Sequence, residues 1–239
     1  MTRRIAILTT FEGDLPFTAR HPDDGAKVAA ALGAQRPDWH FDTWRVSDEH
    51  WPDDAAAYDG IVITGSPASV NDDKPWIARL KQLIRERHAH RGAMLGICFG
   101  HQAIASALGG RVANSPQGLR VGTVTTRLDR LEPWMQPPKG EITLYAAHDE
   151  QVVELPFGAE RLGGDAGCVN GCFRLDRHVF ALQYHPEFSH AFMVDLLDAF
   201  GEKLAPEVLA LGRAQVAGGV DAPLAWQWIA QFFDQSFPA

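Results

Sequence analysis

Cysteine is scarce in this sequence, with 3 among 239 residues, and the odd count does not favour a framework of disulfide bonds. Long hydrophobic runs are missing as well: no stretch of about 18 apolar residues occurs, so we expect no membrane-spanning helix. The N-terminal segment lacks the long apolar region and the small-residue cleavage site of a signal peptide. These absences predict a cytoplasmic protein.

Basic residues are fewer than acidic ones. Lys and Arg number 22 against 30 Asp and Glu, which gives a formal net charge of −8. Domains that bind nucleic acids usually present a basic face, so we expect no nucleic-acid partner. Cys168 and Cys172 are closely spaced, but no second cysteine pair accompanies them and the Asn170-Gly171 dipeptide between them is typical of a turn. We therefore expect no metal site and, since no phosphate-binding loop of the G-x-x-x-x-G-K-[ST] type occurs, no cofactor.

The first half of the chain alternates between strand-like and helix-like segments. Strands separated by helices of 10 or more residues favour a parallel sheet with helices on both faces, which is a doubly wound α/β fold. Asp24 is the expected N-cap of the first helix. We predict strands at 3–10, 40–46, 58–65 and 93–97, and helices at 24–34, 74–89 and 101–110.

The second half is mostly strand-like as far as a buried strand at 179–184, which predicts extra antiparallel strands at one side of the sheet. A helix then follows at 189–204 with Ser189 as its cap. The last residues carry Gly and Pro breaks and a Trp-rich amphipathic helix. We expect residues 1–204 to form one domain and residues 205–239 a helical extension packed on it, because so short a segment does not form a second domain.

Cys98 lies where the strand at 93–97 passes into a helix, between Gly96 and Gly100 in the pattern G-x-C-x-G. A nucleophile on so tight a corner needs small neighbours, because the backbone there passes close to adjoining segments. The dipole of the following helix favours the thiolate, and the backbone N–H of Phe99 has no intrahelical acceptor and is free to bind an oxyanion. The alternative is that Cys98 is a small buried side chain and the glycines only serve packing.

A thiolate nucleophile needs a base, and the base needs a group that orients it. His185 emerges at the end of the strand at 179–184, and Glu187 follows two residues later in a His-Pro-Glu triplet. A carboxylate on one ring nitrogen leaves the other to accept the thiol proton. We therefore predict a triad of Cys98, His185 and Glu187. His101 is the rival base, and we expect it to be structural because the corner turns the sulfur away from the helix axis.

A second oxyanion donor is expected at the end of a neighbouring strand. Gly65 follows the apolar residues of the strand at 58–65, and a glycine allows the backbone to approach a ligand closely with its N–H directed into a cleft. The alternative is an ordinary strand-to-loop turn.

The combination of GICFGHQ with TGSP upstream and QYHPE downstream resembles the class I glutamine amidotransferase family, over roughly residues 4 to 200. This resemblance implies a flavodoxin-like scaffold and a substrate that is glutamine or another γ-glutamyl compound. It also implies that Cys98 attacks the side-chain amide to form a γ-glutamyl thioester, that His185 shuttles the proton and that Glu187 orients His185.

The same resemblance implies how the substrate is held. Gly65 and Phe99 donate backbone N–H groups to the oxyanion, and Gln102 lines the glutamine pocket. His148 falls where family members often carry a histidine, and no chemistry is assigned to it. The segment around Gly65 reads Thr-Gly-Ser-Pro, whereas the family pattern is closer to Gly-Gly-Pro.

No S-G-G-x-D-S-like loop of an attached synthase occurs, and the resemblance is greatest to stand-alone members, among them GMP synthase-like amidotransferases and γ-glutamyl peptidases. Such a subunit either docks on a separate synthase subunit or hydrolyses γ-glutamyl peptides or conjugates alone. Two further readings remain: a different cysteine hydrolase on the same scaffold, and a binding subunit whose pocket is blocked.

Overall fold

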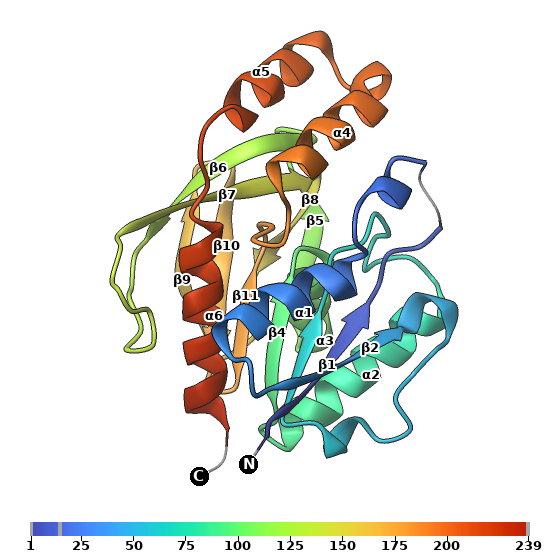
Figure 1. Ribbon diagram of the computed structural model, residues 1–239, viewed down its shortest axis with the longest axis vertical. Coiled ribbons are helices and arrows are strands. Elements are labelled where there is room, and N and C mark those ends of the chain that lie inside the picture. The colour runs from blue at the N-terminus through green and yellow to red at the C-terminus, as the bar shows by residue number, and fades with distance from the viewer. Residues whose placement is uncertain (1, 14–15, 238–239) are drawn as a thin grey trace.

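The computed structural model describes residues 2–13 and 16–237. Its main feature is a nine-stranded mixed sheet with the order β2-β1-β3-β4-β11-β10-β9-β6-β7, and helices cover it as Figure 1 shows. The parallel strands are β1 (Arg4–Thr9), β2 (His40–Arg45), β3 (Gly60–Ile63), β4 (Ala93–Ile97) and β11 (Val179–Leu182). The expected mostly parallel sheet at the centre of the fold is confirmed.

Helices cover both faces of the parallel strands, as expected. α1 (Asp24–Gln35) packs in one hydrophobic core, whereas α2 (Pro75–Ala89) and α3 (Phe99–Ala107) pack in the other, on the opposite face. The side chain of Asp23, not that of Asp24, caps α1 by accepting from the N–H of Ala26. The expected cap at Asp24 was therefore wrong, and the Asp24 side chain pairs with Lys27 instead.

The antiparallel strands extend the sheet beyond β11, as expected. They are β6 (Arg120–Leu128), β7 (Glu141–His148), β9 (Ala159–Asp165) and β10 (Cys168–Leu175), while β5 (Arg111–Asn114) and β8 (Glu150–Glu154) form a separate two-stranded sheet. The expected turn at Asn170-Gly171 was wrong, because both residues lie inside β10 at an irregular register. Packing explains this glycine, since a Cβ at Gly171 would lie 2.6 Å from the hydroxyl oxygen of Tyr184.

Among the described residues, three α-helices follow the last strand: α4 (His190–Phe200), α5 (Pro206–Val216) and α6 (Ala222–Ser236). Ser189 caps α4 as expected, because its side chain accepts from the N–H of Phe192. α6 packs against α1 and buries its tryptophan and phenylalanine side chains in the same core. α4 and α5 stand at the top of Figure 1, over one end of the strands. The 3-10 helices are η1 (Thr18–Arg20), η2 (Val46–Asp48), η3 (Ala55–Ala57) and η4 (Gly201–Lys203).

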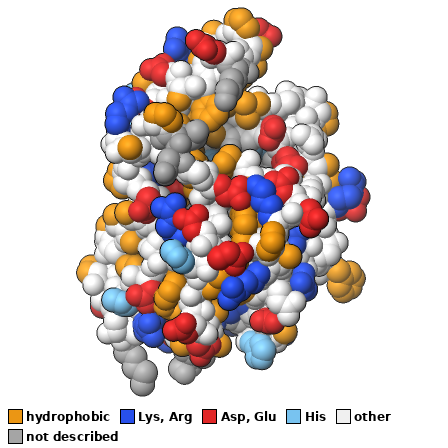
Figure 2. All heavy atoms as spheres, turned by 90° about the vertical axis from the view of Figure 1, so that its right-hand side faces the viewer, with side chains coloured by type: hydrophobic (Ala, Val, Ile, Leu, Met, Phe, Trp, Pro, Cys, Tyr) orange, Lys and Arg blue, Asp and Glu red, His pale blue; other side chains and the backbone are white. Residues whose placement is uncertain are grey.

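None of the helices among the described residues combines the length and the apolar character that crossing a bilayer requires. On the face shown in Figure 2, basic and acidic side chains are interspersed over the lower part, and hydrophobic ones gather in a hollow below the uppermost helices.

The parallel strands fix where chemistry gathers, because their carboxyl ends lie at one edge of the sheet. β1, β3, β4 and β11 are adjacent in the sheet and end immediately before Thr10, Thr64, Cys98 and Gln183 respectively. Segments far apart in the sequence therefore meet at this edge.

Candidate active site

Cys98 occupies the sharp corner between β4 and α3, with backbone angles φ 51° and ψ −104°. A positive φ is costly for a non-glycine residue, by about 1–3 kcal/mol, and persists only where the surroundings enforce it. The two flanking glycines leave room for this corner. A Cβ at Gly96 would lie 2.5 Å from the carbonyl oxygen of Gly100, and a Cβ at Gly100 would lie 2.2 Å from that of Ile63. Only glycine fits at either position.

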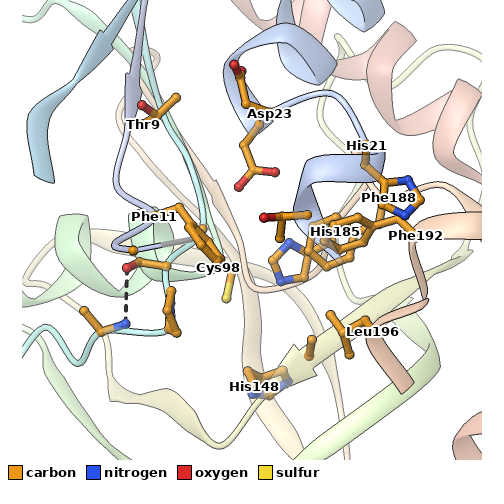
Figure 3. Close-up of a pocket in the computed structure, with 18 of the residues that line it drawn as sticks. Thr9, Phe11, His21, Asp23, Cys98, His148, His185, Phe188, Phe192 and Leu196 are labelled. Carbon is orange, nitrogen blue, oxygen red and sulfur yellow. Dashed lines mark hydrogen bonds between the residues drawn. The ribbon is translucent and has the colours of Figure 1, made fainter. Parts of the chain in front are cut away.

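His185 and Glu187 form a buried pair. The Nδ1 of His185 lies 2.6 Å from Oε1 of Glu187, and both side chains are almost fully buried. Nδ1–H therefore donates to the carboxylate. The other ring nitrogen, Nε2, has no conventional hydrogen-bond partner among the described residues. Figure 3 shows the ring of His185 beside the sulfur of Cys98.

The surroundings of His185 favour its protonated form. Burial alone lowers the pKa of this imidazole, but the charge of the Glu187 carboxylate and, next, that of an ionised Cys98 sulfur outweigh burial and raise the pKa to about 10. A protonated ring beside a sulfur is the arrangement that stabilises a thiolate.

Gly65 brings the two segments together. A Cβ at this position would lie 3.0 Å from Cε1 of His185 and 3.6 Å from Cβ of Cys98, so Gly65 lies beside both residues and leaves little room there for a side chain. The backbone N–H of Phe99 stands at the first position of α3, where no intrahelical acceptor exists.

Gln102 lines the same cavity, and its Nε2 donates to the backbone oxygen of Glu150 at 2.8 Å. The structure thus brings together the six predicted site residues at one edge of the sheet: Cys98, His185, Glu187, Gly65, Phe99 and Gln102. Their chemical roles remain predictions.

His101 is not part of the Cys98–His185 group. Its ring is fully buried, Nε2 donates to the backbone oxygen of Asn170 at 3.0 Å, and burial lowers the pKa of the imidazole to about 3.

His148 lines the cavity. Burial, followed by the charge of Arg120, lowers the pKa of His148 to about 4, so its ring is neutral. Cys168 and Cys172 are buried on β10, and burial raises the pKa of Cys168 to about 12. Among the described residues, no group of three His, Cys, Asp or Glu side chains is arranged to hold a metal ion.

A cavity of about 1340 Å³ opens beside Cys98 and His185. Figure 3 shows side chains from several segments around the sulfur, with Phe11 on one side, Phe188 and Phe192 beyond His185, and His148 on a further side. The described residues therefore leave an open space next to Cys98 and His185.

Sequence reasoning missed Thr10, whose fully buried hydroxyl lies 2.9 Å from the carbonyl oxygen of Gly65 and 3.1 Å from that of Thr64. The available signal was a pair of threonines at the end of the first strand, beside the strand that ends at Gly65. Sequence reasoning also missed Phe188, which stacks on His185 with ring centroids 3.9 Å apart. Its position directly after Glu187 was the signal.

We expect Glu187→Gln to lower the pKa of His185, because the amide still accepts a hydrogen bond but no longer carries the charge that stabilises the imidazolium. Burial, which lowers the pKa, is unchanged in this variant. NMR titration of the histidine ring resonances measures the shift. Asp195→Asn is the matched control, since it removes a carboxylate that pairs with His21 at 2.7 Å and should leave His185 unchanged. A His185 pKa that is the same in wild type and Glu187→Gln contradicts the assignment.

Comparison with known proteins places this geometry in context. The model of the family described as "Glutamine amidotransferase class-I" matches residues 27–201. Gamma-glutamyl peptidase 3 of Arabidopsis thaliana is 29% identical over 177 residues, which are 71% of this chain and 70% of that protein. A glutamine-hydrolyzing GMP synthase of Herminiimonas arsenicoxydans is 32% identical over 155 residues, which are 61% of this chain and 27% of that enzyme.

Solved structures agree with the fold. A glutamine amido transferase from Methylobacillus flagellatus superposes with a TM-score of 0.77 at 21% sequence identity, and the match covers 100% of this chain and 96% of that one. The α/β fold expected from the sequence is therefore confirmed, and so is the resemblance on which the expectation depended.

Proposed function

This chain belongs to the class-I glutamine amidotransferase family, and on that premise we propose that it hydrolyses γ-glutamyl amides by thiol catalysis at Cys98. Family membership and the similarity to a γ-glutamyl peptidase support a hydrolase that acts on glutamine-type amides. The observation that carries the proposal is the position of Gly65 beside both Cys98 and His185, because a nucleophile, a proton carrier and a backbone N–H donor then share one place.

In the first half of the reaction the Cys98 thiolate attacks the carbon of the γ-amide. The negative charge that develops on the carbonyl oxygen is bound by the backbone N–H groups of Gly65 and Phe99. The His185 imidazolium gives its Nε2 proton to the amide nitrogen, the C–N bond breaks, and ammonia or an amine leaves. The product on the enzyme is a γ-glutamyl thioester.

In the second half a water molecule takes the place of the amine. Neutral His185 removes a proton from this water, the hydroxide oxygen attacks the thioester carbon, and the C–S bond breaks. Glutamate leaves, and the thiolate–imidazolium pair is restored. Glu187 holds the ring orientation through both halves and stabilises the positive charge that His185 carries before the first half and after the second.

The released nitrogen has two possible fates. In an amidotransferase, ammonia passes to a synthase. The similarity to a GMP synthase supports this fate, and the partner of this chain would then be a separate synthase subunit. In a γ-glutamyl peptidase, the amine is simply released. We favour the second fate, because the similarity to the peptidase spans 70% of that protein whereas the similarity to the synthase spans 27%.

Purified protein tests this choice when it is given glutamine and γ-glutamyl dipeptides side by side, with glutamate release as the readout. Turnover of dipeptides that needs no added protein supports the peptidase. Weak glutaminase activity that rises on addition of a synthase, without turnover of dipeptides, overturns it in favour of the amidotransferase.

Thr10 is a positioning residue for the Gly65 backbone. The carbonyl oxygen of Thr64 accepts from the N–H of Gly100 at 3.1 Å and lies the same distance from the Thr10 hydroxyl. Because a trans peptide directs its C=O and N–H oppositely, fixing this carbonyl also fixes the direction of the Gly65 N–H.

We expect Thr10→Val to lower kcat by about 10-fold with little change in KM, because the Gly65 N–H then meets the oxyanion less well. Thr10→Ser keeps the hydroxyl and should retain most of kcat, which separates positioning from general loss of stability. Equal activity of the valine and serine variants would contradict this role.

A further inference from the structure

The cavity is much larger than the part that the triad needs. Ligand pockets commonly measure about 300–1,000 Å³, whereas this one measures about 1340 Å³. Glutamine is a small molecule and would leave most of that space filled by water. The unused part calls for a second portion of the substrate.

Aromatic rings form the wall next to His185. Phe188 stacks on the imidazole with an interplanar angle of 7°, and the ring of Phe192 lies 4.4 Å from that of Phe188. Phe17 adds a third ring, 5.5 Å from Phe192, and Leu196 continues this wall along α4. Phe188 precedes α4, Phe192 and Leu196 lie on α4, and Phe17 lies in the segment before α1. Together we call these four side chains the apolar wall.

The direction of the chemistry assigns this wall to the leaving group. His185 must protonate the departing nitrogen, so that nitrogen lies on the imidazole side of the sulfur. Substituents on the nitrogen then extend past His185, where Phe188 and Phe192 stand (Figure 3). Gln102 and Glu150, which are polar, also line the cavity and suit the charged end of the γ-glutamyl group.

Three of the basic side chains that line the cavity already have acidic partners. Lys27 pairs with Asp24 at 2.9 Å, Arg45 with Asp48 at 2.8 Å, and His21 with Asp195 at 2.7 Å. Lys27 also lies over the ring of Phe192, at 3.7 Å from its centroid. A carboxylate on the leaving amine would therefore have to compete with Asp24, Asp48 and Asp195 for these basic side chains. Without a partner it would lie unpaired beside an apolar surface, where a charge is costly.

We propose that the preferred substrate is a γ-glutamyl amide whose amine portion is apolar and carries no carboxylate or other charge. This amine portion binds against the apolar wall, and the inference rests on the hydrolysis proposed above. The wall buries the apolar part of the amine, and the paired basic groups select against amino acids as leaving groups. The apolar wall is thus a leaving-group subsite that glutamine does not fill.

Three synthetic substrates test this assignment with the full chain: γ-glutamyl benzylamide, γ-glutamyl methylamide and γ-glutamylphenylalanine. The first two differ in the apolar group, and the first and third differ mainly in the carboxylate. We expect kcat/KM for the benzylamide to exceed that for the methylamide by roughly 10-fold or more, because burial of an aromatic group favours binding on that scale. The benzylamide should also exceed γ-glutamylphenylalanine, by a smaller factor.

Two variants on α4 test whether the preference for the benzylamide depends on the apolar wall. Leu196→Ser should reduce the benzylamide-to-methylamide ratio several-fold, because it makes the wall polar at one point. Val194→Ser is the matched control, since Val194 is on α4, is 39% exposed and does not line the cavity. It should leave the ratio unchanged. Measurable turnover of the methylamide by each variant confirms that it has folded.

The outcomes separate this inference from the proposed function. Turnover that depends on Cys98 but is equal for benzylamide and methylamide, or faster for γ-glutamylphenylalanine, overturns the leaving-group subsite and leaves the hydrolase intact. No Cys98-dependent turnover of any γ-glutamyl compound overturns the proposed function itself.

Discussion

Cys98→Ala should lower the hydrolysis of γ-glutamyl amides by about 10⁵-fold or more, because removal of the nucleophile of a triad eliminates the covalent route. The free energy of unfolding should change by less than about 1 kcal/mol, since the substitution removes one sulfur at the edge of a cavity and leaves the glycine contacts of the corner intact. Steady-state glutamate release and thermal denaturation measure the two effects.

Cys172→Ala is the control for the first prediction. Cys172 is buried in the core away from the cavity lining, so its loss should affect stability and leave the turnover of folded protein close to that of wild type. Retention of activity in Cys98→Ala would show that another group carries the reaction.

His185→Asn should lower kcat by about 10³-fold or more, because general acid–base catalysis contributes about 10²–10⁴-fold and this residue also stabilises the thiolate. The loss should exceed that in Glu187→Gln, in which the proton carrier is still present. Full progress curves at several pH values measure kcat for each variant.

His190→Asn is the control for the second prediction. His190 lies on α4, and its Nδ1 donates to the backbone oxygen of Val216 at 3.0 Å, outside the cavity lining. Its replacement should leave kcat unchanged. Wild-type kcat in His185→Asn, with a loss in His190→Asn, would exclude His185 as the proton carrier.

Much of the fold could be predicted from local patterns. The strand before Cys98 is apolar at every position except Gly96, which identifies it as buried on both faces, and the burial of all five residues agrees. Local patterns did not predict the correct helix cap where two neighbouring residues can both serve as the cap. Asp23 and Asp24 are both good caps, and only the helix geometry decides that Asp23 accepts from Ala26.

The Asn170-Gly171 turn failed for a different reason. The dipeptide has strong turn preference, but the requirement for space beside Tyr184 explains the glycine equally well. Such a contact depends on the partner strand β11 and the residues after it, and no local pattern reveals it.

The candidate site depends on sheet order. The sequence gives no distance between Cys98 and His185, but β4 and β11 are neighbours in the sheet, and Leu182 pairs with Ile97 in register. That adjacency brings the corner and the His-Pro-Glu segment to the same edge. The apolar wall could not be predicted, because it requires α4 to fold over this edge so that Phe192 reaches Phe188 and Phe17.

The most direct test of the central claim is mass-spectrometric mapping of the protein after reaction with a glutamine-analogue electrophile. We predict that one adduct forms, that it lies on the peptide containing Cys98, and that γ-glutamyl substrate slows its formation. His185→Asn should react far more slowly, because the thiolate loses its imidazolium partner. An unlabelled Cys98 in folded protein, or labelling at Cys168 or Cys172 instead, would contradict the claim that Cys98 is an activated nucleophile.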